Sequence, residues 1–147
     1  MIITIERKVS LEPKFFDRNI NTHILNKLKS TMEGNCYIDL GYVTKIIKLI
    51  KILNNIIIPS NSYVVFHIVC KIEVIKPVVG KIITELITRI TEDGLFVDIG
   101  VEKIRILVPV NSYPENKNFK TGMKISVKII LVKYVNKQYK CMGHIVN

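Results

Sequence analysis

The chain has 147 residues, a length that suits one domain or two small ones. Hydrophobic residues make up 48% of the sequence, which is enough to bury a core and excludes a disordered tail or a fibrous repeat. Lys and Arg number 22 against 12 Asp and Glu, and the net charge of +10 favours an anionic partner such as nucleic acid, unless the excess serves only solubility.

The cysteines and the hydropathy of the sequence indicate a reducing, intracellular compartment. Cys36, Cys70 and Cys141 lie far apart and are odd in number, a pattern typical of free thiols rather than of disulfides or a zinc site. Residues 1–9 lack the apolar run of a signal peptide, and no stretch reaches the roughly eighteen apolar residues of a membrane span. We therefore expect a soluble intracellular protein that has no membrane partner.

The first part of the chain predicts a strand followed by a helix. Residues 1–9 alternate loosely between apolar and polar, and Pro13 then turns the chain. A helix is expected over residues 19–33, capped by Asp17 or Asn19 and ended by Gly34. One apolar stripe runs along it at the spacing of a helical turn: Ile20, Ile24, Leu28 and Met32. Such a helix packs against a flat partner such as a sheet.

Residues 42–53 carry a mixed signal. Three lysines at i, i+3 spacing imitate an amphipathic helix, but the many β-branched residues favour a strand. Residues 63–75 are almost entirely Val, Ile, Phe and Tyr, and predict a long strand after the turn at 59–62. A helix and three strands predict a small α+β unit that ends near Lys76 and Pro77.

The rest of the chain predicts a small antiparallel barrel. Turn signals, among them Asp93-Gly94 and Asn136-Lys137, separate five expected strands: residues 80–91, 95–99, 103–108, 123–135 and 138–146. A polar loop is expected from Asn111 to Gly122. Five strands in a short segment are typical of the OB-fold, a five-stranded Greek-key barrel.

Few residues suggest catalysis. The glycines are scattered rather than gathered in a phosphate-binding loop, and the three histidines stand apart, without metal-ligand spacing. His67 in the long strand is interpreted as a packed or half-exposed residue, and Glu92-Asp93 as part of a turn. We expect no enzymatic activity, no metal and no cofactor.

The predicted barrel offers a binding surface instead. If Leu95, Val97 and Ile99 face inward, Phe96 faces outward, and the same alternation turns Lys103 and Arg105 outward on the next strand. OB-folds use such aromatic and cationic groups to stack a base and to hold a phosphate. The alternative is that Phe96 packs beneath a neighbouring unit while the two cations form a solvated face.

Later lysines extend this predicted surface. With Ile125, Val127, Ile129 and Leu131 inward, Lys124 and Lys128 face outward, and Lys137 lies in the last turn. The predicted nucleic-acid-binding set is therefore Phe96, Lys103, Arg105, Lys124, Lys128 and Lys137. Binding of single-stranded nucleic acid through these groups would be electrostatic and would weaken with salt.

The order of these parts resembles one family along almost the whole chain, from about Ile3 to Gly143. It is similar to the stalk subunits of eukaryotic and archaeal RNA polymerases, the family of polymerase II subunit seven and its archaeal counterpart. Five parts of the chain carry the likeness: Val9-Ser10-Leu11-Glu12-Pro13-Lys14-Phe15-Phe16; Glu33-Gly34-Asn35-Cys36 with Gly41-Tyr42-Val43; Ile58-Pro59 through Phe66 with Val74-Ile75-Lys76-Pro77 and Gly80-Lys81-Ile82; Gly94-Leu95-Phe96-Val97-Asp98-Ile99-Gly100; and Met142-Gly143. The resemblance implies that residues 42–53 form a strand and that the barrel is of the ribosomal S-one RNA-binding type.

The resemblance also implies an organisation and a role. Residues 1–78 would form a tip domain that docks on the large polymerase subunits near the clamp, and residues 79–147 an OB-fold that binds nascent single-stranded RNA. A smaller stalk subunit would pack along the chain, and the chain itself would be non-catalytic. The implied docking residues lie in one loop: Glu33, Gly34, Asn35, Cys36, Tyr37, Gly41 and Tyr42.

Two departures from the family bear on the origin of the chain. The loop at 111–122 is short where nuclear members of the family carry a longer, acidic insertion, and their acidic C-terminal extension is absent. Together with the abundance of Lys, Ile and Asn, they favour a copy from a large DNA virus, found in the virion and host cytoplasm, over a cellular subunit in the nucleus. Two other functions stay open: a free-standing OB-fold translation factor, and an assembly protein whose charge neutralises packaged nucleic acid.

Overall fold

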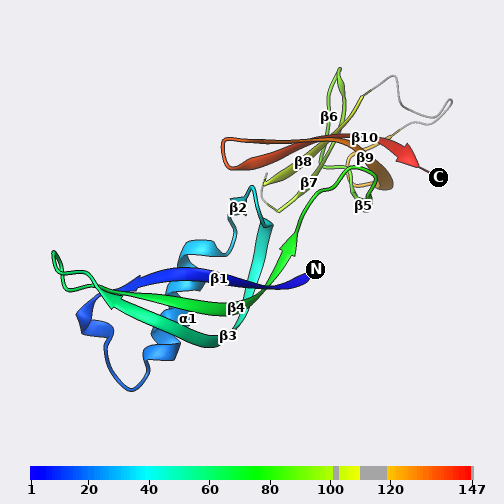
Figure 1. Ribbon diagram of the computed structural model, residues 1–147. Coiled ribbons are helices and arrows are strands. Elements are labelled where there is room, and N and C mark those ends of the chain that lie inside the picture. Colours follow the sequence, from blue (N-terminus) through cyan, green and yellow to red (C-terminus); the bar gives the residue numbers. More distant parts are fainter. Residues whose placement is uncertain (101–102, 110–118, 147) are drawn as a thin grey trace. The chain divides into compact units, whose positions relative to one another are not determined.

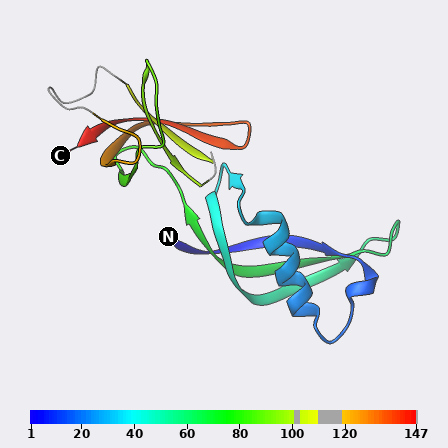
Figure 2. The same ribbon diagram turned by 180° about the vertical axis from the view of Figure 1, so that it is seen from behind.

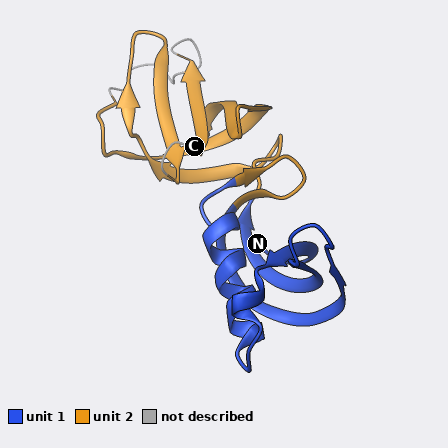
Figure 3. Ribbon diagram, turned by 90° about the vertical axis from the view of Figure 1, so that its left-hand side faces the viewer, with its two compact units in different colours: residues 1–35, 43–75 blue, residues 36–42, 76–147 orange. Residues whose placement is uncertain are grey.

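The computed structural model describes residues 1–100, 103–109 and 119–146, and the chain divides into two compact units. The first unit comprises residues 1–35 and 43–75, and the second comprises residues 36–42 and 76–147 (Figure 3). This division differs from the expected one, 1–78 and 79–147, in two places: residues 76–78 and the loop of residues 36–42 both group with the barrel. The loop does so because side chains of the barrel hold its backbone, as described below.

The first unit consists of a helix and a twisted antiparallel sheet. Its elements are β1 (Ile2–Leu11), the 3-10 helix η1 (Pro13–Phe15), α1 (Ile20–Met32), β3 (Gly41–Ile57) and β4 (Val64–Ile75). The sheet has the order β1-β4-β3-β2, where β2 (Cys36–Tyr37) is a two-residue strand that pairs with the start of β3. The predicted helix is confirmed, and the ambiguous segment 42–53 is a strand, in agreement with its β-branched composition.

The helix buries its apolar stripe against one face of this sheet, as Figures 1 and 2 show from opposite sides. Ile24, Leu28 and Met32 are buried, whereas Ile20 in the first turn is only half-buried. The β1–β4 register sets Val9 opposite Phe66, and both are buried. The neighbouring residues of β1 and β4 face the other way and are mostly polar or half-exposed, as expected for a sheet covered on one face.

His67 lies on that other face, as the sequence predicts for a half-exposed residue. Its Nε2 atom lies 3.2 Å from Oε2 of Glu6 on β1, and about a third of its side chain is exposed. In the part of the chain that the structure describes, no group of three or more His, Cys, Asp or Glu side chains is arranged to hold a metal ion.

The second unit is a curled β-sheet. Its strands are β5 (Ile82–Leu86), β6 (Arg89–Ile90), β7 (Gly94–Ile99), β8 (Ile104–Pro109), β9 (Lys124–Val135) and β10 (Gln138–Val146). They follow the order β5-β9-β10-β8-β7-β6, with β8 and β10 parallel and the other pairs antiparallel. Because β5 and β6 are consecutive parts of one segment, the two ends of the sheet meet. This topology confirms the predicted OB-fold class.

One predicted strand is divided in two. Residues 80–91 were expected to form a single strand, but β5 pairs with β9 whereas β6 pairs with β7. Between them, the backbone N–H of Ile87 donates to Met123 and that of Thr88 donates to Phe96. A segment that closes a barrel must change neighbours, and this one does so at the buried Ile87.

A second correction concerns Leu131, which was expected inside the barrel and is 43% exposed. The alternation holds up to the buried Ile129, which pairs with Gly143, but the next pair is Leu131 with Met142. Ile130 is therefore the extra residue of a β-bulge, and a bulge moves every later side chain to the opposite face. Gly143 permits this packing, because a Cβ there would clash with a methyl carbon of Val127.

The polar loop expected from Asn111 to Gly122 lies mostly outside the described residues. Within the described ranges, no helix has the length and apolar character needed to cross a bilayer.

Candidate nucleic-acid interface

The outer face of the β7-β8-β10-β9 sheet carries two parallel rows of side chains. The strand registers align one row that is charged, consisting of Asp98, Arg105, Lys140 and Lys133. The adjacent row is apolar, consisting of Phe96, Leu107, Met142 and Leu131. We call these two rows the platform. A pocket of about 230 Å³ is lined by residues of both rows.

The aromatic end of the platform is rigidly held. The guanidinium carbons of Arg89 and Arg105 lie 5.2 Å and 5.5 Å from the centroid of the Phe96 ring. Arg105 also donates two hydrogen bonds to the Asp98 carboxylate, from Nε to Oδ1 at 3.1 Å and from Nη2 to Oδ2 at 3.4 Å. Asp98 therefore neutralises Arg105, whose flat guanidinium extends the stacking surface of the ring.

The other end of the charged row is unbalanced. Lys133 and Lys140 are exposed and directly opposite each other on antiparallel strands, an arrangement that costs free energy through like-charge repulsion. Among the described residues, no carboxylate lies within ion-pair distance of either lysine. Phosphates bound beside them would relieve this repulsion, and would lie two residues along each strand from the apolar row.

The platform contains only part of the residue set predicted from the sequence. Phe96 and Arg105 are in contact, as expected for a stacking and cationic pair. Lys124 and Lys128 lie before the bulge, where β9 pairs with β5, and Lys137 lies in the two-residue turn between β9 and β10. Lys103 begins the approach to β8, and its backbone carbonyl accepts a hydrogen bond from the N–H of Tyr139.

The sequence reasoning missed the lysines that face each other and the apolar row beside them. Lys133 takes part in the platform only because the bulge turns it outward, and regular alternation from Ile129 would have placed it inside. The signal was present in the run Ile129-Ile130-Leu131-Val132, since four consecutive apolar residues break the alternation of a barrel strand.

The loop predicted to dock on the polymerase is fastened to the barrel within the second unit. Tyr134 Oη donates to the backbone carbonyl of Cys36 at 3.0 Å, and Tyr139 Oη donates to that of Tyr37. The Cys36 thiol lies 3.5 Å from the carbonyl of Lys103. Backbone groups are thus held by buried or half-buried side chains, which fixes the conformation of the loop.

Burial divides the residues of this loop into two kinds. Cys36, Leu40 and Gly41 are buried, whereas Ile38 at the turn is 70% exposed. Within the predicted docking set, Glu33, Gly34 and Asn35 belong to the first unit, and Cys36, Tyr37, Gly41 and Tyr42 to the second. Cys36 and Gly41 therefore support the loop from inside, and Ile38 offers its exposed apolar surface.

The tyrosine that fastens the loop is strongly perturbed. Tyr139 is 3% exposed, and this burial, reinforced by the nearby Cys36 and Tyr134, raises its pKa from 10.0 to about 12. Burial also raises the pKa of the Cys141 thiol, which lines the platform pocket, from 9.0 to about 11. Both groups are therefore neutral near pH 7, and Cys141 is a poor nucleophile there.

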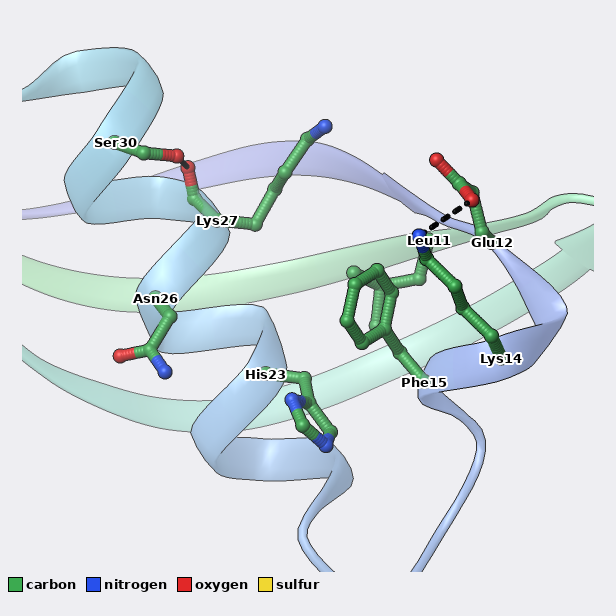
Figure 4. Close-up of a pocket in the computed structure, with 8 residues that line it drawn as sticks. All are labelled: Leu11, Glu12, Lys14, Phe15, His23, Asn26, Lys27 and Ser30. Atoms are coloured by element: carbon green, nitrogen blue, oxygen red, sulfur yellow. Dashed lines mark hydrogen bonds and ion pairs between the residues drawn. The ribbon is translucent and has the colours of Figure 1, made fainter.

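The first unit has a pocket of its own, of about 460 Å³, between α1 and the segment around η1 (Figure 4). Its lining is mixed: Leu11, Glu12, Lys14, Phe15, His23, Asn26, Lys27 and Ser30. Lys14 pairs with Glu12 at 3.4 Å, and the rings of Phe15 and His23 pack with centroids 5.1 Å apart. Lys14 and Glu12 therefore compensate each other's charge, and Lys27 is the remaining lysine of the lining.

Comparison with known families covers both units. Residues 6–64 match the SHS2 domain found in the N terminus of Rpb7p/Rpc25p/MJ0397, and residues 76–139 match the S1 RNA binding domain. The chain belongs to the Rpb7 family of RNA polymerase stalk subunits. The resemblance found in the sequence is thereby confirmed. Subunits of this family are non-catalytic components of the polymerase.

Individual relatives agree with this membership. The chain is 28% identical over 120 residues to DNA-directed RNA polymerase II subunit 7 of Arabidopsis thaliana, a match that spans 82% of this chain and 67% of the relative. It is 27% identical over 120 residues to DNA-directed RNA polymerase II subunit RPB7 of Glycine max, with the same coverage. A subunit rpb7 of Schizosaccharomyces pombe is 22% identical over 113 residues, which span 76% of this chain and 64% of the relative.

Proposed function

We propose that this Rpb7-family chain binds nascent single-stranded RNA on the platform of its S1 domain while docked on a DNA-directed RNA polymerase. The observation that carries the proposal is the juxtaposition of two opposed, unpaired lysines with an apolar row that ends in Phe96. The lysines would hold successive phosphates, and the apolar row would receive bases. Unpaired bases stack on aromatic rings and on guanidinium planes, and the platform offers both.

Docking on the large polymerase subunits would use the loop of residues 36–42, with Ile38 as its main contact. Support comes from the exposure of Ile38 in a loop whose backbone is otherwise held by Tyr134 and Tyr139. An apolar side chain presented on a fixed loop loses little conformational entropy on binding. Association with a smaller stalk subunit would follow from this role, and so would a location in the nucleus if the chain is cellular. An origin in a large DNA virus, with a location in the virion and host cytoplasm, stays a prediction.

RNA binding is tested by replacing Phe96. Loss of base–aromatic stacking costs about 1–3 kcal/mol per base, so Phe96→Ala should weaken binding of a labelled single-stranded RNA by several-fold or more. Phe16→Ala provides the control, because it removes a 40% exposed Phe from the first unit. Unchanged RNA affinity in Phe96→Ala, with circular dichroism confirming the fold, would move the RNA to another surface. Equal affinity of the unmodified chain for duplex DNA would instead favour an assembly protein.

Polymerase association is tested by affinity purification of the full chain followed by mass spectrometry. Large polymerase subunits should co-purify with the unmodified chain and should be depleted with Ile38→Glu, which places a charge on the proposed contact. Val79→Glu is the control, because Val79 is 61% exposed and lies outside the loop. Recovery of ribosomal proteins in place of polymerase subunits would support the translation-factor alternative and overturn the proposal.

A further inference from the structure

Strand β3 forms an edge of the sheet in the first unit, and only its beginning is covered. Beyond its pairing with β2, the N–H and carbonyl of Val43 bond to the carbonyl of Asn35 and the N–H of Gly34 at 2.9 Å and 2.8 Å. Oε2 of Glu33 accepts a hydrogen bond from the N–H of Ile46 at 3.0 Å. Glu33, Gly34 and Asn35, which follow the helix, thus provide hydrogen-bond partners for the backbone of this edge as far as Ile46.

The edge continues after this covered part. β3 runs on to Ile57, and its neighbour there among the described strands is β4 on the other side, in the order β1-β4-β3-β2. Backbone groups along a strand point alternately to its two sides, so about half of the N–H and carbonyl groups of residues 47–57 point away from β4. Among the described elements, none pairs with this stretch on that side, which leaves a row of donors and acceptors to solvent.

The side chains along this stretch are basic and aliphatic. Lys45, Lys48 and Lys51 are basic, and the sequence from Gly41 to Ile57 contains no acidic residue. Four aliphatic side chains are also exposed, by between 41% and 66%: Ile50, Leu53, Ile56 and Ile57. Natural edge strands are usually short or interrupted, so a long edge with exposed aliphatic side chains is suited to strand addition.

We propose that the free edge of β3, residues 47–57, takes up an extended segment of a partner protein in which acidic and aliphatic residues alternate. The added segment would hydrogen-bond to the free backbone groups, as in other complexes formed by strand addition. Its carboxylates would meet the lysines and its aliphatic side chains would cover the exposed isoleucines. Pairing with a second copy of β3 is disfavoured because it would bring like-charged lysines together.

The probe is a fluorescent ten-residue peptide in which Glu and Val alternate, with a peptide of the same composition that carries prolines at alternate positions as its control. Proline lacks the N–H that strand addition needs, so only the first peptide should bind the full chain. Binding should also slow hydrogen exchange at those amides of residues 47–57 that exchange rapidly in the free chain. Equal binding of both peptides, or no change in exchange at these amides, would overturn the proposal.

Charge variants test the same site independently. Lys48→Glu with Lys51→Glu should weaken peptide binding at least tenfold, whereas Lys27→Glu with Lys29→Glu on the exposed side of α1 makes the same change in net charge and should leave it unaltered. If both variants weaken peptide binding equally, the effect is due to net charge alone and the proposed site is wrong. If sedimentation shows that the free chain self-associates and that the β3 variant alters this association, the edge binds a second copy of the chain. If single-stranded RNA competes with the peptide, the edge binds nucleic acid. Either of those two results would also overturn the proposal.

Discussion

Replacing Lys133 and Lys140 together by Ala tests the RNA path most directly. Both lysines are exposed, directly opposite each other and without a carboxylate partner among the described residues, whereas Arg105 in the same row is held by Asp98. On single-stranded nucleic acid, each phosphate neutralised adds about 0.7 to the slope of log affinity against log salt. Loss of two such contacts should therefore make the slope shallower by about 1.4.

The matched control is Lys124→Ala with Lys128→Ala. It removes the same charge from β9, but before the bulge, where the strand pairs with β5. We expect this control to lower affinity slightly through the general field of the protein, with little change in slope. Fluorescence anisotropy of a labelled single-stranded RNA between about 50 and about 200 mM salt measures both quantities. An equal or larger loss of slope in the control would show that total charge, and not the platform, holds the RNA.

Further predictions concern stability. Tyr139→Phe loses the hydrogen bond to Tyr37 and should cost about 1 kcal/mol at neutral pH. Folding raises the pKa of Tyr139 from 10.0 to about 12, so this group contributes about 2–3 kcal/mol of stability that is present below pH 10 and lost as the pH rises through 12. Urea denaturation should therefore show the variant to be less stable than the unmodified chain at neutral pH and more stable than it near pH 12. Gly143→Ala should destabilise the second unit by about 1–3 kcal/mol, because its Cβ would approach a backbone carbonyl to 2.7 Å; an unchanged melting temperature would show that the bulge relaxes freely. Glu33→Ala should cost about 1–2 kcal/mol, since it leaves the N–H of Ile46 without its acceptor, and faster exchange of that amide reports the loss.

Much of the fold was predictable because its signals are local. The spacing of Ile24, Leu28 and Met32 indicates a helix with one apolar face, and the structure buries these three residues. In the barrel, Leu95 and Val97 are buried and Phe96 and Asp98 are partly exposed, as the alternation predicts, whereas Ile99 at the end of the strand is only half-buried. Residues 42–53 form a strand, although their lysines have helical spacing, because their many β-branched side chains suit an extended backbone.

What could not be predicted depends on pairing between distant strands. The break at Ile87 arises because one segment serves two neighbours, a requirement of barrel closure that no local pattern reveals. The exposure of Leu131 depends on which residue of β10 lies opposite it. Similarly, the loop 36–42 joins the barrel through hydroxyl groups about one hundred residues further along the chain, at Tyr134 and Tyr139.

The bulge at Ile130 explains how strand β9 contributes to both candidate sites, the platform and the loop of residues 36–42. Before the bulge, odd-numbered residues of β9 such as Ile125 and Val127 point into the barrel, and unbroken alternation would send Lys133 inward and Tyr134 outward. One extra residue reverses both directions. Lys133 then joins the outer platform opposite Lys140, while Tyr134 packs against Tyr139 with ring centroids 5.0 Å apart and reaches the loop backbone. A regular β9 would therefore bury a lysine and release the loop, so RNA binding and polymerase docking, as proposed, depend on the same local irregularity.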